Sequence, residues 1–228
     1  MGEYKSGFST RYAHIDPKSK AYIMPSTQPR QQQTTLPSNL TATLQDAPSA
    51  GNPKLATCPP ATLYRLQHLH PAEIITLFTP VVPHPPSTSL AKNMDPFEPL
   101  GRALAIQHQV RHVPYRLDHG MTETHADFLH ASGAVVMVVC ATDHVVAHNR
   151  SAFYQQAAFA RDAMLAIKNK PSLIGVPVFV LLVSDGPARM AQESCLQHVG
   201  PALVTLDEYT PAALSNVVRA MFRSRNPF

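Results

Sequence analysis

The chain is short of cysteine and of long hydrophobic runs, and each shortage excludes a class of protein. Its three cysteines, Cys58, Cys140 and Cys195, are widely spaced and form no Cys-x-x-Cys pair. A sparse, odd-numbered set is typical of reduced thiols, which argues against a secreted disulfide framework and against a cysteine-based zinc site. We expect Cys140, which follows a run of apolar residues, to be a small core residue.

The longest apolar stretches, residues 133–141 and 173–183, are far shorter than the roughly 20 residues that a membrane-spanning helix needs. The N-terminal segment lacks the central hydrophobic region of a secretory signal. We therefore expect no membrane partner and a cytoplasmic location.

Proline is abundant where apolar periodicity is absent. Of the 22 prolines, 8 lie in the first 60 residues. Such a segment cannot bury enough apolar surface to offset the entropy of ordering it, so residues 1–60 are predicted to be an extended arm. Aromatic and large apolar side chains nevertheless occur at intervals in its first 24 residues. Rigid rings on an extended chain can fill pockets of a partner. The candidate partner-binding residues of the arm are Tyr4, Phe8, Tyr12, Ile15, Tyr22 and Met24.

From residue 61 to residue 228 the pattern is that of an α/β domain. The run Ala134–Val139 is continuously apolar and mostly β-branched, which indicates a strand buried on both faces. In the segment 151–169, apolar residues recur every three or four positions, as on one face of a helix. Alternation of strands and helices predicts a mostly parallel sheet with helices on both faces. The remaining predicted strands are 74–78, 113–117, 176–183 and 202–206, and the remaining predicted helices are 96–109, 122–130, 188–198 and one from Thr210.

The order of these elements resembles the small GTPases of the Ras, Rab and Arf type over residues 72–224. Tyr115–Met121 occupies the place of that family's Asp-x-x-Gly, and the stretch VPVFVLLV resembles its guanine-binding strand. The resemblance implies a P-loop small-GTPase-like fold. A flavodoxin-like domain shares the same alternation and stays open as an alternative.

The residues that such a family uses to bind nucleotide are missing. Residues 79–89, after the first strand of this pattern, contain no glycine and no lysine, and four prolines there each remove a backbone N–H donor. The turn Ser184–Pro187 replaces Asn-Lys-x-Asp, and we expect Ser184 or Asp185 to cap the next helix. Asp118 and Gly120 are two residues apart instead of three. We therefore predict no cofactor, no small-molecule substrate and no enzymatic activity.

Two pairs of histidines have the four-residue spacing that can place two metal ligands on one face of a helix. His108 and His112 lie across the predicted end of a helix, and His144 and His148 lie in a predicted loop. No cysteine or glutamate nearby completes a ligand set. We predict no metal site.

Basic charge gathers at both ends of the chain, which favours an acidic partner. Residues 1–60 hold six Lys or Arg and three acids, and three arginines follow Glu208 with no further acid. The arm and the degenerate domain together resemble, in style, the microtubule inner proteins of ciliary doublets. This resemblance implies a structural subunit of the axoneme that binds tubulin or neighbouring subunits. The alternatives are an accessory subunit of the mitochondrial ribosome, which would contact RNA, and an atypical nucleotide-binding switch.

Overall fold

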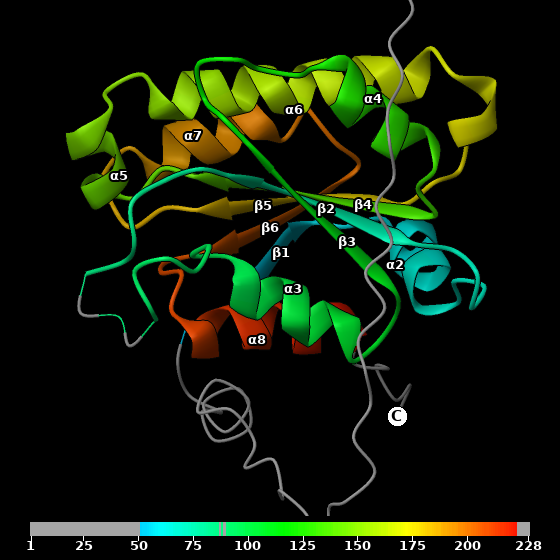
Figure 1. The fold of residues 1–228 in the computed structure, drawn as a ribbon, viewed down its shortest axis with the longest axis horizontal. Coiled ribbons are helices and arrows are strands. Elements are labelled where there is room, and N and C mark those ends of the chain that lie inside the picture. The colour runs from blue at the N-terminus through cyan, green and yellow to red at the C-terminus, as the bar shows by residue number, and fades with distance from the viewer. Residues whose placement is uncertain (1–50, 87, 89, 223–228) are drawn as a thin grey trace, which may run out of the picture. The chain divides into compact units, whose positions relative to one another are not determined.

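A six-stranded, mostly parallel sheet forms the centre of the computed structural model, which describes residues 51–86, 88 and 90–222. Helices cover both of its faces (Figure 1). The strands are β1 (Lys54–Thr57), β2 (Ile75–Pro80), β3 (Val110–Tyr115), β4 (Ala134–Cys140), β5 (Val178–Val183) and β6 (Ala202–Leu206). The helices are α2 (Pro60–Gln67), α3 (Glu98–Ala105), α4 (Glu123–His130), α5 (Asp143–His148), α6 (Ala152–Lys168), the 3-10 turn η1 (Pro171–Leu173), α7 (Arg189–Leu196) and α8 (Pro211–Phe222). This architecture confirms the predicted fold class.

The strand order is β1-β6-β5-β4-β2-β3, with β1 antiparallel to β6 and the other neighbours parallel. Counted along the chain, the five parallel strands have the order 2-1-3-4-5 of flavodoxin-like sheets. Helices α4, α6 and α7 lie on one face, and α2, α3 and α8 lie on the other (Figure 1). The chain therefore changes face between β2 and β4, which are neighbours in the sheet.

Strand β4 shows why this sequence forms a central strand. All seven of its residues are buried. Side chains of a strand alternate between the two faces, and accordingly Ala134, Val136 and Val138 join the core beneath α3 and α8, while Val135 and Met137 join the core beneath α6. A strand that is apolar at every position can be stable only between two layers of helices.

The predicted apolar face of α6 is buried as expected. Phe153, Ala157, Ala160, Met164 and Ile167 are each at most 8% exposed. Their spacing of three and four residues places them along one side of the helix, against the sheet. Among the elements predicted from periodicity, this helix agrees most closely with the structure.

The first strand lies inside the segment that was predicted to be the arm. Lys54 and Leu55 of β1 pair with Thr205 and Val204 of β6, so the sheet begins before residue 61. Helix α2, which the sequence pattern did not predict, begins at Pro60. Among the described residues, no helix is long and apolar enough to cross a membrane.

The first turn of helix α4 contains a histidine, His125, whose neutral form the fold requires. The Thr122 N–H donates to Nδ1 of His125 at 3.0 Å, so this nitrogen must be unprotonated. His125 is only 8% exposed, and burial lowers its pKa below the usual 6.5. An unfolded chain therefore takes up this proton at a higher pH than the folded chain does. Stability from this group is full above about pH 6.5 and is lost as the pH falls.

We expect His125→Asn to weaken the acid sensitivity of the protein. Between about pH 7.5 and about pH 5.5, the wild type should lose more free energy of unfolding than the variant, measured by urea denaturation. His119→Asn is the matched control, because that histidine is exposed in the same region of the chain. Equal losses in the wild type and in His125→Asn would contradict the assignment.

Candidate functional site at the carboxyl edge of the sheet

The strands β2 and β4 separate before they end, and this opens a crevice at the carboxyl edge of the sheet. Their paired residues run from Ile75 and Ala134 to Phe78 and Met137. Beyond that point β2 continues along β3, and β4 continues along β5 to Cys140. Flavodoxin-like folds bind their cofactors at this position, where the connections change face.

The separation leaves backbone N–H and C=O groups of β4 without a partner strand, and side chains of the protein form hydrogen bonds with them. Tyr115 donates its hydroxyl proton to the Val138 carbonyl at 2.9 Å. Gln156, which is fully buried in α6, accepts from the Cys140 N–H at 2.6 Å and donates to the Cys140 carbonyl at 2.8 Å. Buried backbone groups need partners, and here the chain supplies them itself. The inner part of the crevice is thereby closed by the protein's own hydrogen bonds.

The segment after β2 is also fixed by hydrogen bonds within the protein. The Val81 N–H donates to the Tyr115 carbonyl at 2.9 Å, and the Tyr209 hydroxyl donates to the Pro83 carbonyl at 3.0 Å. Pro80, Pro83, Pro85 and Pro86 have no N–H to offer an anion. A phosphate cradle needs several convergent backbone N–H groups, and this segment does not have them.

Cys140 is unsuited to nucleophilic chemistry. Its thiol is fully buried at the end of β4, and burial raises its pKa to about 12. The thiolate is the reactive form of cysteine, so this residue stays a neutral core group, as the sequence predicted. Burial also raises the pKa of the nearby Tyr209 hydroxyl, which keeps it a hydrogen-bond donor to Pro83.

The turn after β5 does not cap α7 in the way that was predicted. Ser184 donates to the Gln192 side chain at 2.6 Å, and Asp185 accepts from the Asp143 N–H at 2.8 Å. Asp143 is the first residue of α5, whereas α7 has Ala188 at its N-cap and no side-chain cap. The prediction that Ser184 or Asp185 caps the following helix is therefore wrong. Asp185 instead fixes the loop of the neighbouring strand, which sequence distance concealed.

A close contact between the same two loops favours glycine at position 186. A Cβ added to Gly186 would collide with the Asp143 carboxylate. We expect Gly186→Ala to lower the free energy of unfolding by about 1 kcal/mol or less, because the exposed Asp143 carboxylate can turn away from the added Cβ.

Because the clash involves one side chain, Asp143→Ala should remove most of the cost of the Gly186→Ala change. A double-mutant cycle of these two substitutions, measured by chemical denaturation, tests this coupling. Simple additivity of the two effects would show that the Asp143 carboxylate is not the group that restricts position 186.

Asp118, in the place of the Asp-x-x-Gly motif, forms an exposed ion pair. Arg116 donates to its carboxylate at 2.9 Å, and this hydrogen bond holds the pKa of Asp118 below its usual range. Gly120 has a φ of 61°, a left-handed conformation that suits glycine. The two residues therefore have local roles in the turn after β3.

The two histidine pairs lie in different settings, and the second pair does not lie where it was predicted. His112 lies in β3, with its ring between Thr79 at 2.8 Å and Glu98 at 3.3 Å. His144 and His148 lie on helix α5, not in the predicted loop, and their rings are 4.7 Å apart. Within residues 51–86, 88 and 90–222, no group of three or more His, Cys, Asp or Glu side chains could hold a metal ion.

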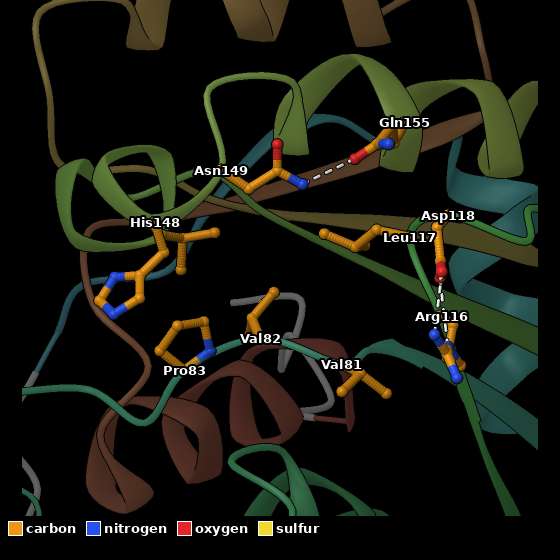
Figure 2. Close-up of a pocket in the computed structure, with 10 residues that line it drawn as sticks. Val81, Val82, Pro83, Arg116, Leu117, Asp118, His148, Asn149 and Gln155 are labelled. Carbon is orange, nitrogen blue, oxygen red and sulfur yellow. Dashed lines mark hydrogen bonds and ion pairs between the residues drawn. The ribbon is translucent and has the colours of Figure 1, made fainter.

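A hollow of about 260 Å³ lies at the outer end of the crevice (Figure 2). The segments after β2 and β3 supply its Val81, Val82, Pro83 and Leu117 side chains, and α5 supplies Val145. Its polar lining consists of the Arg116–Asp118 pair, His148, Asn149 and Gln155. No sequence pattern indicated this hollow, because its residues come from four separate parts of the chain.

The six residues predicted to anchor the arm, Tyr4, Phe8, Tyr12, Ile15, Tyr22 and Met24, lie outside the described residues. Their role in partner binding stays a prediction.

Comparisons with known proteins give no family assignment. No protein-family model and no curated protein matches the chain. Among solved structures, the fold is similar to part of a glycoside hydrolase family 3 β-N-acetylglucosaminidase from Paenibacillus sp. str. FPU-7, at 14% identity and a TM-score of 0.47. The match covers 90% of this chain and 33% of the enzyme, so the chain spans about a third of that protein's length. A likeness at this level gives no information on function.

Proposed function

We propose that the chain is a non-catalytic subunit that docks onto a larger assembly. The observation that carries this proposal is the closure of the β2–β4 crevice from inside. Tyr115 and Gln156 hold the free backbone groups of β4, and Tyr209 holds Pro83. Folds of this order use these positions for cofactors, and a chain that satisfies them internally is better suited to a scaffold role.

The exposed side of α6 supports docking to an acidic partner. Tyr154, Arg161, Leu165 and Lys168 are spaced along one side of this helix, and we call them the α6 outer face. Tyr154 is 70% exposed and Leu165 is 58% exposed, so both offer apolar surface to a partner. Basic residues outnumber acids here, because residues 150–170 contain four exposed Lys or Arg and one exposed acid, Asp162.

Two exposed apolar side chains flanked by positive charge match a negatively charged protein surface. Tubulin, on the inner wall of axonemal doublets, is the partner that we propose, with the aromatic arm supplying a second attachment. The domain would then fix the position of the subunit through α6, while the arm extends its contact with the assembly.

Co-sedimentation with microtubules tests this proposal. The full chain should pellet with microtubules, and Arg161→Glu with Lys168→Glu should weaken binding about tenfold, because the double reversal replaces two positive charges with two negative ones against an acidic surface. Lys54→Glu with Lys92→Glu is the matched control, since it changes net charge equally and leaves α6 intact. The control variant should bind like the wild type.

Equal weakening in both double variants would show that only net charge matters and would contradict docking through α6. Absence of the wild-type chain from the pellet would reject tubulin as the partner. Localisation of a tagged full chain to mitochondria would replace the axonemal proposal with the ribosomal one.

A further inference from the structure

The segments that lead into the five parallel strands lie side by side along one edge of the sheet, which we call the amino edge. Backbone hydrogen bonds of 2.9 Å join neighbouring segments there, namely Ile75 to Gln109, Gly133 to Ile74 and Val135 to Pro177. Figure 1 shows α2 and the C-terminal ends of α4 and α6 at this edge. Side chains that are far apart in the sequence therefore form one surface here.

Acidic residues are almost absent from the loops of the amino edge. The loops before β2 to β6 contain one acid, Glu73, and it forms an ion pair with Arg65 of α2. The loops and helix starts at the opposite edge hold eight acids, among them Asp118, Asp143 and Asp185. Helix dipoles favour carboxylates at helix N-termini, which lie at that opposite edge. The loops of the amino edge therefore have almost no carboxylate to compete for an anionic partner.

Three exposed histidines and one exposed lysine lie along the amino edge, namely His68, His130, His198 and Lys170. Nδ1 of His68 lies 2.8 Å from the Tyr64 carbonyl, so this nitrogen carries a proton and Nε2 can take up a second one. The His68 ring also stacks on the Tyr64 ring at 4.0 Å, a contact that favours a charged imidazole. Because histidines gain charge as the pH falls below about 7, the positive charge of this edge rises on acidification.

The other charged and titratable groups at this edge leave that change intact. His70 and His108 use Nδ1 to accept from neighbouring backbone N–H groups, which only an unprotonated nitrogen can do. The helices that end here carry further charges in their last turns, namely Arg65, Arg102, Asp127, Lys168, Glu193 and Arg219. Carboxylates, lysines and arginines keep their charge between about pH 6 and about pH 7.5. The exposed histidines are therefore the groups whose charge varies.

Two exposed isoleucines flank the histidines. Ile106 is 74% exposed and Ile174 is 80% exposed, in the segments before β3 and β5. These strands are three positions apart in the sheet, which corresponds to about 14 Å, or about four residues of an extended peptide. The segments that lead into β2 and β4 lie between them and carry His68 and His130. A short extended segment with carboxylates between two apolar side chains matches this order.

We propose that the amino edge binds an acidic peptide segment of a protein partner, and that it binds this segment more tightly as the pH falls. Carboxylates of the peptide face His68, His130 and Lys170, and its apolar side chains contact Ile106 and Ile174. A nucleic acid matches this edge less well, because its affinity depends on many cations and few are present. The surface lies beyond the α6 outer face and does not depend on docking through it.

Fluorescence anisotropy of a rhodamine-labelled Leu-Glu-Glu-Glu-Leu peptide, titrated with the full-length chain, tests this proposal. Binding should be about fivefold tighter at about pH 6 than at about pH 7.5, because the newly charged histidines form exposed ion pairs with the peptide. The matched peptide Leu-Gln-Gln-Gln-Leu should bind more weakly at both pH values and show no pH dependence, since it has no carboxylate side chains.

Two triple variants separate the amino edge from the rest of the molecule. Combined His68→Gln, His130→Gln and His198→Gln substitutions should remove the pH dependence. The control combines the same change at three histidines of the opposite edge and should keep the pH dependence; these are His119, His144 and His148.

A second pair of variants tests the apolar contacts. Ile106→Ser with Ile174→Ser should weaken binding about tenfold at both pH values. Leu165→Ser with Met190→Ser, which changes two other exposed apolar side chains, should leave binding unchanged.

The proposal is wrong if the acidic peptide fails to bind or if its affinity is the same at both pH values. It is also wrong if the control histidine variant loses the pH dependence as fully as the amino-edge variant. Pelleting of the chain with phosphatidylserine vesicles, without binding of the peptide, would assign this surface to a membrane and equally overturn the proposal.

Discussion

Replacing Gln156 with leucine is expected to lower the free energy of unfolding by about 3 kcal/mol or more. Leucine fills the same space but leaves the N–H and the carbonyl of Cys140 buried without partners. Each such orphaned group costs about 1–3 kcal/mol. For a domain of this size, the change corresponds to a fall in Tm of about 6–12 °C, which a thermal melt followed by circular dichroism measures directly.

The neighbouring residue supplies the control for this substitution. Gln155→Leu changes the same kind of side chain one position earlier, but Gln155 is only partly buried and bonds to the Asn149 side chain instead of the sheet. We expect it to change the Tm by only a few degrees. If both variants melt at the same temperature, the bonds from Gln156 to β4 do not support the crevice as described.

The second large effect concerns where the domain begins. A chain that starts at residue 51 should melt like the full-length protein, whereas a chain that starts at residue 61 should melt lower and aggregate. The longer deletion removes β1, which pairs along Leu203–Thr205, and leaves the edge of β6 uncovered. Uncovered strand edges are sites of aggregation. It also removes Gly51, which packs closely against Ala213 of α8.

Thermal melts combined with light scattering distinguish the two truncations. Removing the exposed strand β1 also deletes the partly buried Leu55 and Cys58, which pack against the core. If the chain 61–228 is as stable and as soluble as the chain 51–228, β1 contributes nothing and the predicted boundary at residue 60 is the better one.

Elements with a complete internal pattern could be predicted from the sequence. Strand β4 is apolar at every position, and α6 repeats its buried residues at helical spacing over four turns, so each has a local signal. The order of strands could not be read in this way, because register and neighbours depend on contacts between distant segments. Both the small-GTPase-like and the flavodoxin-like alternatives therefore fitted the same pattern.

The missed elements depend on tertiary contacts. Strand β1 has four residues, of which only Leu55 is partly buried, and its partner β6 lies about 150 residues later in the chain. Helix α5 has six residues and begins where Thr142 and Asp185 accept hydrogen bonds from its backbone. The contribution of Asp185 could not be assigned without knowing that the loops after β4 and β5 are adjacent.

The closure of the crevice could be predicted only in part from the sequence. The prolines after β2 predicted the loss of a phosphate cradle. The sequence did not reveal that Tyr115 and Gln156 complete β4, because a buried tyrosine and a buried glutamine look like ordinary residues of a strand and a helix. Only their hydrogen bonds at the separation of β2 and β4 show this role.

Titration of the full-length chain with Mg²⁺-GTP and with FMN, followed by calorimetry, tests the central claim most directly. A crevice whose backbone groups are already bonded should give no saturable heat with either compound at micromolar concentrations. Saturable micromolar binding of either one would contradict the proposed scaffold role and return the chain to the nucleotide-binding or flavin-binding proteins.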